Sequence, residues 1–139
     1  MIVADTGAVY ALLDGADRHH RTLRRVFEED PRGWILPWAI LPEVDYFASA
    51  RLGRTVADAF REDVLNGRFV VEWGTRADLV RAVELDRLYA DLDLGLVDTV
   101  VMAVAERLGA QAVATLDLRD FAPVELEGAP ELWPRDQKR

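Results

Sequence analysis

The stretch Met1-Ile2-Val3-Ala4-Asp5-Thr6-Gly7 opens the chain and decides how the rest of it is interpreted. Residues 2–4 form a short apolar run, which is typical of a strand buried in the middle of a sheet. The run ends on the carboxylate of Asp5, and Thr6 and Gly7 then turn the chain. Because an open α/β sheet binds its ligands at the carboxyl ends of its strands, this pattern predicts that Asp5 lies at a functional site.

The size and composition favour one globular domain over residues 1–139. Half of the residues are apolar and 30% are charged, which is a globular balance. The chain contains no cysteine, so disulfides and thiolate metal sites are excluded, and a reducing cytoplasm is compatible. Met1 leads directly into the first strand, so we expect no signal peptide. No apolar run approaches the roughly 18 residues of a membrane helix, so we expect no membrane partner.

Apolar periodicity predicts strands that alternate with helices. The expected strands cover residues 2–4, 34–36, 69–71 and 112–116, with a weak edge strand near Val124. The expected helices cover residues 7–13, 19–30, 40–50, 55–65, 75–89 and 96–108. This order predicts a single α/β domain with a central, mainly parallel sheet of four to five strands, covered by helices on both faces. Residues 133–139 are polar, and we expect them to form a flexible tail.

The net charge of −8 argues against a protein that binds nucleic acid by charge alone. It argues less against an enzyme whose acids hold divalent cations, because the ion inverts the local field. The basic residues are clustered, and six of them are candidates for contacts with RNA: Arg18, Arg21, Arg24, Arg25, Arg51 and Arg54. Solvated helix faces explain the same clusters. Trp34 and Trp38 are suited either to stacking on a base or to packing in the core or a dimer interface.

Four acids occupy positions from which they could meet. Asp5 and Asp117 each follow a predicted strand, so both lie at the same edge of a parallel sheet. Glu43 and Asp98 each lie near the start of a predicted helix and flank its apolar stripe. Singly, capping and the helix dipole explain each acid. Together, the four would repel unless a cation neutralised them. Without cysteine, the cation should be a hard one with oxygen ligands, Mg²⁺ or Mn²⁺, which suits phosphoryl chemistry.

Four motifs in sequence resemble the PIN-domain family. Asp5-Thr6-Gly7 follows a terminal strand, and Pro42-Glu43 begins a helix pair. Leu94-Gly95-Leu96-Val97-Asp98-Thr99 leads into an Ala/Val-rich helix. Thr115-Leu116-Asp117-Leu118-Arg119-Asp120-Phe121 is similar to the closing T-x-D-x-x-D-F of that family. The order and spacing match over nearly the whole chain, and its size is most similar to that of VapC-type toxins of bacterial type II toxin–antitoxin systems.

The resemblance implies a Mg²⁺-dependent ribonuclease with Asp5, Glu43, Asp98 and Asp117 as its catalytic and metal-binding acids. Asp5, Asp98 and Asp117 would hold one or two ions, and Glu43 would bind a second ion or position the attacking water. The resemblance also implies a homodimer and a cognate antitoxin whose C-terminal segment covers the site. Thr6 and Thr115 match hydroxyl positions that orient the site or its waters. Asp91 and Asp93 lie in a loop that often carries further acids, and they are accessory candidates.

Other functions explain the sequence less well. A phosphatase of the haloacid dehalogenase type needs a second Asp two residues after the nucleophile, and this chain has Gly7 there. A dinucleotide-binding domain would show G-x-G-x-x-G after the first strand, and none is present. Two alternatives stay open, namely another Mg²⁺-dependent phosphohydrolase and a non-catalytic module that keeps the PIN fold to bind a partner.

Overall fold

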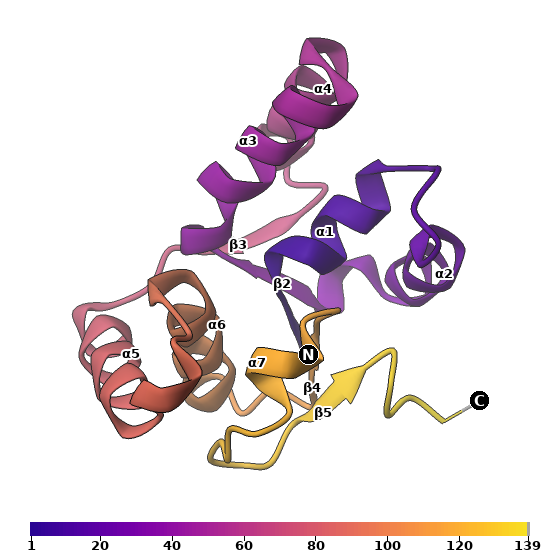
Figure 1. Ribbon diagram of the computed structural model, residues 1–139. Coiled ribbons are helices and arrows are strands. Elements are labelled where there is room, and N and C mark those ends of the chain that lie inside the picture. The colour runs from indigo at the N-terminus through magenta and orange to yellow at the C-terminus, as the bar shows by residue number, and fades with distance from the viewer. Residues whose placement is uncertain (139) are drawn as a thin grey trace.

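The computed structural model describes residues 1–138, and Figure 1 shows a central sheet with helices on both of its faces. The strands are β1 (Ile2–Ala4), β2 (Trp34–Pro37), β3 (Val70–Glu72), β4 (Ala112–Ala114) and β5 (Glu131–Trp133). The helices are α1 (Thr6–Leu13), α2 (His20–Glu29), α3 (Leu41–Leu52), α4 (Arg54–Leu65), α5 (Arg76–Leu88), α6 (Leu96–Arg107) and α7 (Leu118–Phe121). Short 3₁₀ turns span Pro31–Gly33, Trp38–Ile40 and Ala90–Leu92.

The five strands are all parallel and lie in the order β3-β2-β1-β4-β5. The chain moves from β1 through β2 to β3, and then returns past β1 to β4 and β5. Right-handed crossovers therefore place α1 to α4 on one face and α5 to α7 on the other, as Figure 1 shows. The order of the strands reverses between β1 and β4, which is where an open α/β sheet forms its binding crevice. The expected α/β domain with a parallel sheet is confirmed.

Short apolar strands form the centre of the core because they are covered on both sides. Every residue of β1 and β4 is buried. Trp34 of β2 is fully buried and packs edge-on against Phe27 of α2, with ring centroids 5.4 Å apart. Of the two functions considered for Trp34, core packing is therefore the one that its position permits. The stripe of α6 that includes Val101 and Val104 is also buried, as its spacing predicts.

Helices α5 and α6 are joined by two reciprocal arginine–carboxylate pairs. Arg107 of α6 donates to both carboxylate oxygens of Asp78 at 2.7 and 3.0 Å. Arg81 of α5 donates to both carboxylate oxygens of Glu106 at 2.7 and 3.1 Å. Asp78 also forms a capping box with Thr75 at the start of α5. These planar, two-bond contacts fix α5 against α6.

The edge strand differs from the sequence expectation. It lies at Glu131–Trp133 and not near Val124, which is instead a buried residue just after α7. Parallel neighbours need a connection of about a dozen residues or more, so Val124 follows β4 too closely to begin a parallel partner. The expectation of a flexible tail from residue 133 is also wrong at its start, because the backbone oxygen of Trp133 accepts from the nitrogen of Thr115 at 3.0 Å. Asp136 accepts from the nitrogen of Leu132 at 2.8 Å. Arg139 lies outside the described residues.

Within residues 1–138, the helices are all too short or too polar to cross a bilayer.

Candidate active site

Asp5 lies at the carboxyl end of β1 and caps the start of α1. Its Oδ1 accepts from the nitrogen of Thr6 at 2.8 Å, and its Oδ2 accepts from the hydroxyl of Thr115 at 3.0 Å. Its own nitrogen donates to the oxygen of Ala114, which extends the pairing of β1 with β4. Burial raises the pKa of Asp5 from 3.8 to about 6, against the effect of its two hydrogen bonds. Repulsion from Asp117 and Glu43 adds to the rise in this pKa.

The second half of the chain contributes three more acids. Asp98 lies in the first turn of α6, Asp117 caps α7, and Asp120 lies within α7. One carboxylate oxygen from each of these acids falls within 4.8 Å of the other two. Burial, the hydrogen bond with Asp120 and the neighbouring charges hold the pKa of Asp98 well above its usual range. Burial and repulsion by Asp120 also raise the pKa of Asp117.

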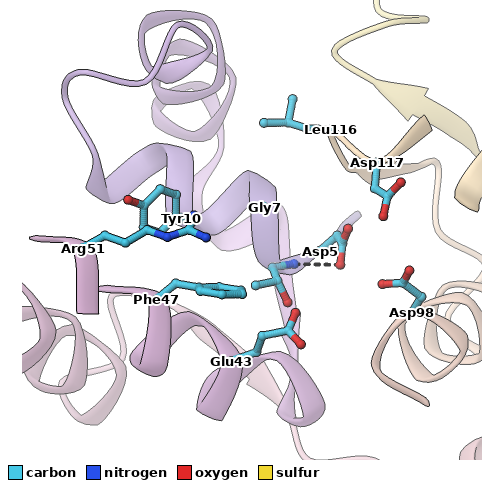
Figure 2. A pocket seen from close by; sticks show the side chains of 10 residues that line it. Asp5, Gly7, Tyr10, Glu43, Phe47, Arg51, Asp98, Leu116 and Asp117 are labelled. Atoms are coloured by element: carbon cyan, nitrogen blue, oxygen red, sulfur yellow. Dashed lines mark hydrogen bonds between the residues drawn. The ribbon is translucent and has the colours of Figure 1, made fainter. Parts of the chain in front are cut away.

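Asp5, Asp98 and Asp117 border one cavity of about 390 Å³ at the carboxyl ends of β1 and β4. Figure 2 shows Asp5 at its centre, Asp98 and Asp117 close together on one side, and Glu43 rising from α3. The complete lining is Asp5, Thr6, Gly7, Tyr10, Glu43, Phe47, Arg51, Asp98, Leu116 and Asp117. The structure therefore brings together the four acids that the sequence pointed to, from both halves of the chain.

The accessory candidates fall into two groups. Thr6 and Thr115 are buried, and Thr6 lines the cavity. The hydroxyl of Thr115 donates to Asp5 and accepts from the nitrogen of Asp117 at 3.0 Å, whereas the Oγ1 of Thr6 has no hydrogen-bond partner within residues 1–138. Asp91 and Asp93 are exposed and do not border the cavity. Asp93 instead adopts a left-handed conformation at the end of its turn, with φ of 51°.

The six candidate arginines separate by position. Arg51 lines the cavity, and the other five do not. Arg24 is paired with Glu28 at 2.8 Å, and Arg54 with Asp58 at 3.5 Å. Arg18 donates a hydrogen bond to Nε2 of His19 at 3.1 Å, and Arg21 and Arg25 lie exposed on α2. Of the six candidates, Arg51 is therefore the one that lies beside the acids in this cavity.

Sequence reasoning missed two features of this site. Asp120 was not among the expected site residues, although it is the second acid of the closing motif and lies three residues after Asp117, one turn along the helix. The aromatic wall of Tyr10 and Phe47 was also missed, and these rings meet edge-on at a centroid distance of 6.5 Å. Phe47 follows Glu43 by four residues, so helical spacing alone places it on the same side of α3.

The donor set fits a hard divalent cation. Carboxylate oxygens from Asp98, Asp117 and Asp120 converge, and Asp5 lies in the same acidic group. Burial and the repulsion between neighbouring carboxylates raise the pKa values of Asp5, Asp98 and Asp117, and a bound cation would oppose both effects. Oxygen ligands of this kind suit Mg²⁺ or Mn²⁺ better than softer metals. The unpartnered hydroxyl of Thr6 adds a polar atom beside the acids.

Comparison with known proteins identifies the fold. The crystal structure of VapC20 of Mycobacterium tuberculosis, described as a toxin that cleaves the sarcin-ricin loop, superposes with a TM-score of 0.80 at 24% identity, covering 94% of this chain and 99% of that one. The structure of FitAcB from Neisseria gonorrhoeae superposes with a TM-score of 0.64 at 14% identity, covering 95% of this chain and 96% of that one. A search of curated proteins gives no match. The model of the PIN domain matches residues 2–125, so this chain belongs to the PIN domain family.

Proposed function

We propose that this chain is a metal-dependent ribonuclease that hydrolyses RNA phosphodiester bonds. The observation that carries the proposal is the cavity at the ends of β1 and β4, in which Asp5, Glu43, Asp98 and Asp117 meet. Membership of the PIN family and a fold like that of an RNA-cleaving toxin support the same conclusion. Neither alternative, a non-catalytic binding module or another phosphohydrolase, is favoured by an observation at this site.

Each acid has a distinct position for this chemistry. Asp5, Asp98 and Asp117 would hold Mg²⁺ or Mn²⁺, and Asp120 lies close enough to Asp98 and Asp117 to join them. Bound Mg²⁺ supplies a water of lowered pKa and a counter-charge for phosphate oxygens. Glu43 is half-buried and approaches the cavity from α3, so it is placed to orient the attacking water or to bind a second ion. Thr115 fixes the carboxylate of Asp5 by its hydrogen bond.

The proposed partners follow from the same family resemblance. VapC-type toxins act with a cognate antitoxin, and we propose such a protein as the inhibitor of this chain. We also propose a homodimer, supported by an exposed aromatic pair outside the acidic cavity. Trp38 and Trp73 follow β2 and β3, are 49% and 65% exposed, and stack with centroids 5.1 Å apart. Two exposed tryptophans in contact form an apolar patch on the surface, and such patches often mark protein interfaces. With RNA as the proposed substrate and an antitoxin as the proposed inhibitor, we propose that this chain acts in the cytoplasm.

Cleavage of total cellular RNA by the purified chain tests this proposal. We expect discrete fragments with Mg²⁺, none with EDTA, and loss of cleavage in Asp98→Asn. The matched control is Asp86→Asn, which removes the same charge from an exposed position on α5 and should cleave like the unaltered chain. The proposal would be contradicted if the RNA stayed intact with a preparation that is free of any bound partner and that calorimetry shows to bind Mg²⁺. Release of phosphate from mononucleotides under those conditions would favour another phosphohydrolase.

A further inference from the structure

Arg51 is the one cationic side chain among the described residues that line the acidic cavity. It lies in the last turn of α3, and Figure 2 shows it at the opposite end of the cavity from Asp98 and Asp117. Glu43, Phe47 and Arg51 follow one another at intervals of four residues, so they form a single row along the helix. At about 1.5 Å per residue, this row is about 12 Å long.

The guanidinium of Arg51 is held by aromatic rings and not by an acid. Its central carbon lies 4.6 Å from the ring centroid of Phe47 and 5.6 Å from that of Tyr10. Within residues 1–138, no carboxylate lies at ion-pair distance from it, whereas the nearby Arg54 and Arg61 are paired with Asp58 and Asp45. A cation held over a ring face keeps its N–H donors, which lie at the edge of the guanidinium, available for an oxyanion.

A polyanion that enters this cavity needs such a cation. The acids on the opposite side repel phosphate, and a metal ion offsets that repulsion only in its own vicinity. Arg51 lies about 12 Å along the α3 row from Glu43, which is about three to four nucleotides at a helical rise of roughly 3.4 Å and fewer for an extended strand. Its planar fork of donors matches two phosphate oxygens at once.

We propose that Arg51 binds a phosphate of the RNA strand a few nucleotides away from the bond that is cleaved, and that Phe47 and Tyr10 position its guanidinium. This inference rests on the proposed ribonuclease function. It predicts the path of the bound RNA, which would run from the acids at the start of α6 and α7 along α3 to Arg51.

Binding of a labelled, mixed-sequence single-stranded RNA, measured by fluorescence anisotropy in EDTA over a range of salt concentrations, tests the inference. We expect Arg51→Ala to weaken binding about tenfold and to reduce the slope of log K against log salt by about 0.7, the value for one phosphate contact on a single strand. Arg51→Lys should keep the slope and lose part of the affinity, since it keeps the charge without the fork. Phe47→Leu should weaken binding less than Arg51→Ala.

Two controls separate this role from others. Arg54→Ala removes the same charge three residues further along the chain, at the exposed first residue of α4 and outside the cavity, and should leave affinity and slope nearly unchanged. Calorimetric affinity for Mg²⁺ should be the same in Arg51→Ala as in the unaltered chain, because Arg51 is not among the converging carboxylates.

The outcomes distinguish the inference from the function on which it rests. If the unaltered chain cleaves RNA but Arg51→Ala and Arg54→Ala bind it equally well, the role of Arg51 is overturned and the ribonuclease proposal stands. If the unaltered chain neither binds nor cleaves RNA, both fail. If Arg51→Ala retains its RNA affinity but loses a co-purifying protein, Arg51 recognises a protein, and the inference is again overturned.

Discussion

The hydroxyl of Thr115 donates a hydrogen bond to Oδ2 of Asp5 at 3.0 Å and so joins the ends of the two central strands. The hydroxyl oxygen of Thr115 in turn accepts from the nitrogen of Asp117 at 3.0 Å. One side chain therefore sets the orientation of one acid and the backbone position of another. It does so at the point where the strand order of the sheet reverses.

Thr115→Val should disturb the orientation of the Asp5 carboxylate and the position of Asp117 without changing any charge. The variant keeps the shape of the side chain and removes both hydrogen bonds. We expect a loss of about 1 kcal/mol in the free energy of unfolding and a fall of about tenfold in kcat. Thr115→Ser should restore most of both. Urea unfolding and RNA cleavage measure the two effects. Equal activity of the Val variant and the unaltered chain would show that the strand ends hold Asp5 and Asp117 without this hydroxyl.

Asp120→Asn tests the acid that sequence reasoning missed. Its carboxylate lies within 4.8 Å of an oxygen of Asp98 and of Asp117, so its loss should weaken Mg²⁺ binding by about tenfold in calorimetry. The backbone nitrogen of Asp120, which donates to Asp117 at 3.3 Å, remains in the variant, so the cap of α7 should persist. Asp86→Asn serves as the control. An unchanged Mg²⁺ affinity would place Asp120 outside the metal site.

The metal-free protein should lose stability as the pH rises through about 6. The pKa of Asp5 is raised from 3.8 to about 6 on folding, so the folded state binds more protons between these values. Its contribution to stability is thus fully present below pH 3.8 and is lost as the pH passes through about 6. We expect the difference in unfolding free energy between the unaltered chain and Asp5→Asn to change by about 2 kcal/mol between pH 4 and pH 7.5 in EDTA.

Addition of Mg²⁺ supplies the complementary measurement. It should recover more stability at pH 7.5 than at pH 5, because the ligand carboxylates must be deprotonated to bind it. If the unfolding free energies of the unaltered chain and of Asp5→Asn depended on pH in the same way in EDTA, Asp5 would not be the group that causes the loss of stability.

Arg107→Ala should destabilise the fold by about 2 kcal/mol, because it leaves the buried carboxylate of Asp78 without its two-bond partner. Arg24→Ala, which breaks an exposed pair within α2, should cost less than about 0.5 kcal/mol. Urea unfolding at one pH compares the two. Similar losses in both variants would mean that the α5–α6 pairing contributes no more than a surface ion pair.

Trp73→Arg should convert the proposed dimer to a monomer without loss of fold. The Trp73 ring is 65% exposed, so a charged replacement costs little in the isolated chain but would be costly in an interface. Sedimentation velocity measures the change in mass. The control is Leu88→Arg, at an exposed position on α5. Leu88 borders neither of the two cavities that Trp38 and Trp73 line. A monomeric unaltered chain would remove the basis for the proposed dimer.

The central strands and the four acids were predictable because local pattern and burial agree there. Residues 2–4 are apolar and end on Asp5, so both the strand and the place of the acid follow from one rule about parallel sheets. Asp98 was predictable from the stripe of α6, which fixes the side of the helix on which it lies.

Other features depend on contacts between distant segments, and periodicity does not report these. Glu131–Trp133 has a single buried residue, Leu132, between two partly exposed ones, so its pattern is no stronger than that around Val124. Its place is fixed by pairing with β4. The stacking of Trp38 on Trp73 joins the ends of two different strands, and only the finished sheet brings them together.

The reversal of strand order between β1 and β4 also has a consequence for biosynthesis. Asp5 and Glu43 are made early, whereas Asp98, Asp117 and Asp120 come from the last third of the chain. A nascent polypeptide therefore holds only two of these five acids until α6, β4 and α7 have left the ribosome and β4 has docked beside β1. The cavity forms only after residues up to the end of α7 have been made, so products truncated before that helix lack an assembled site.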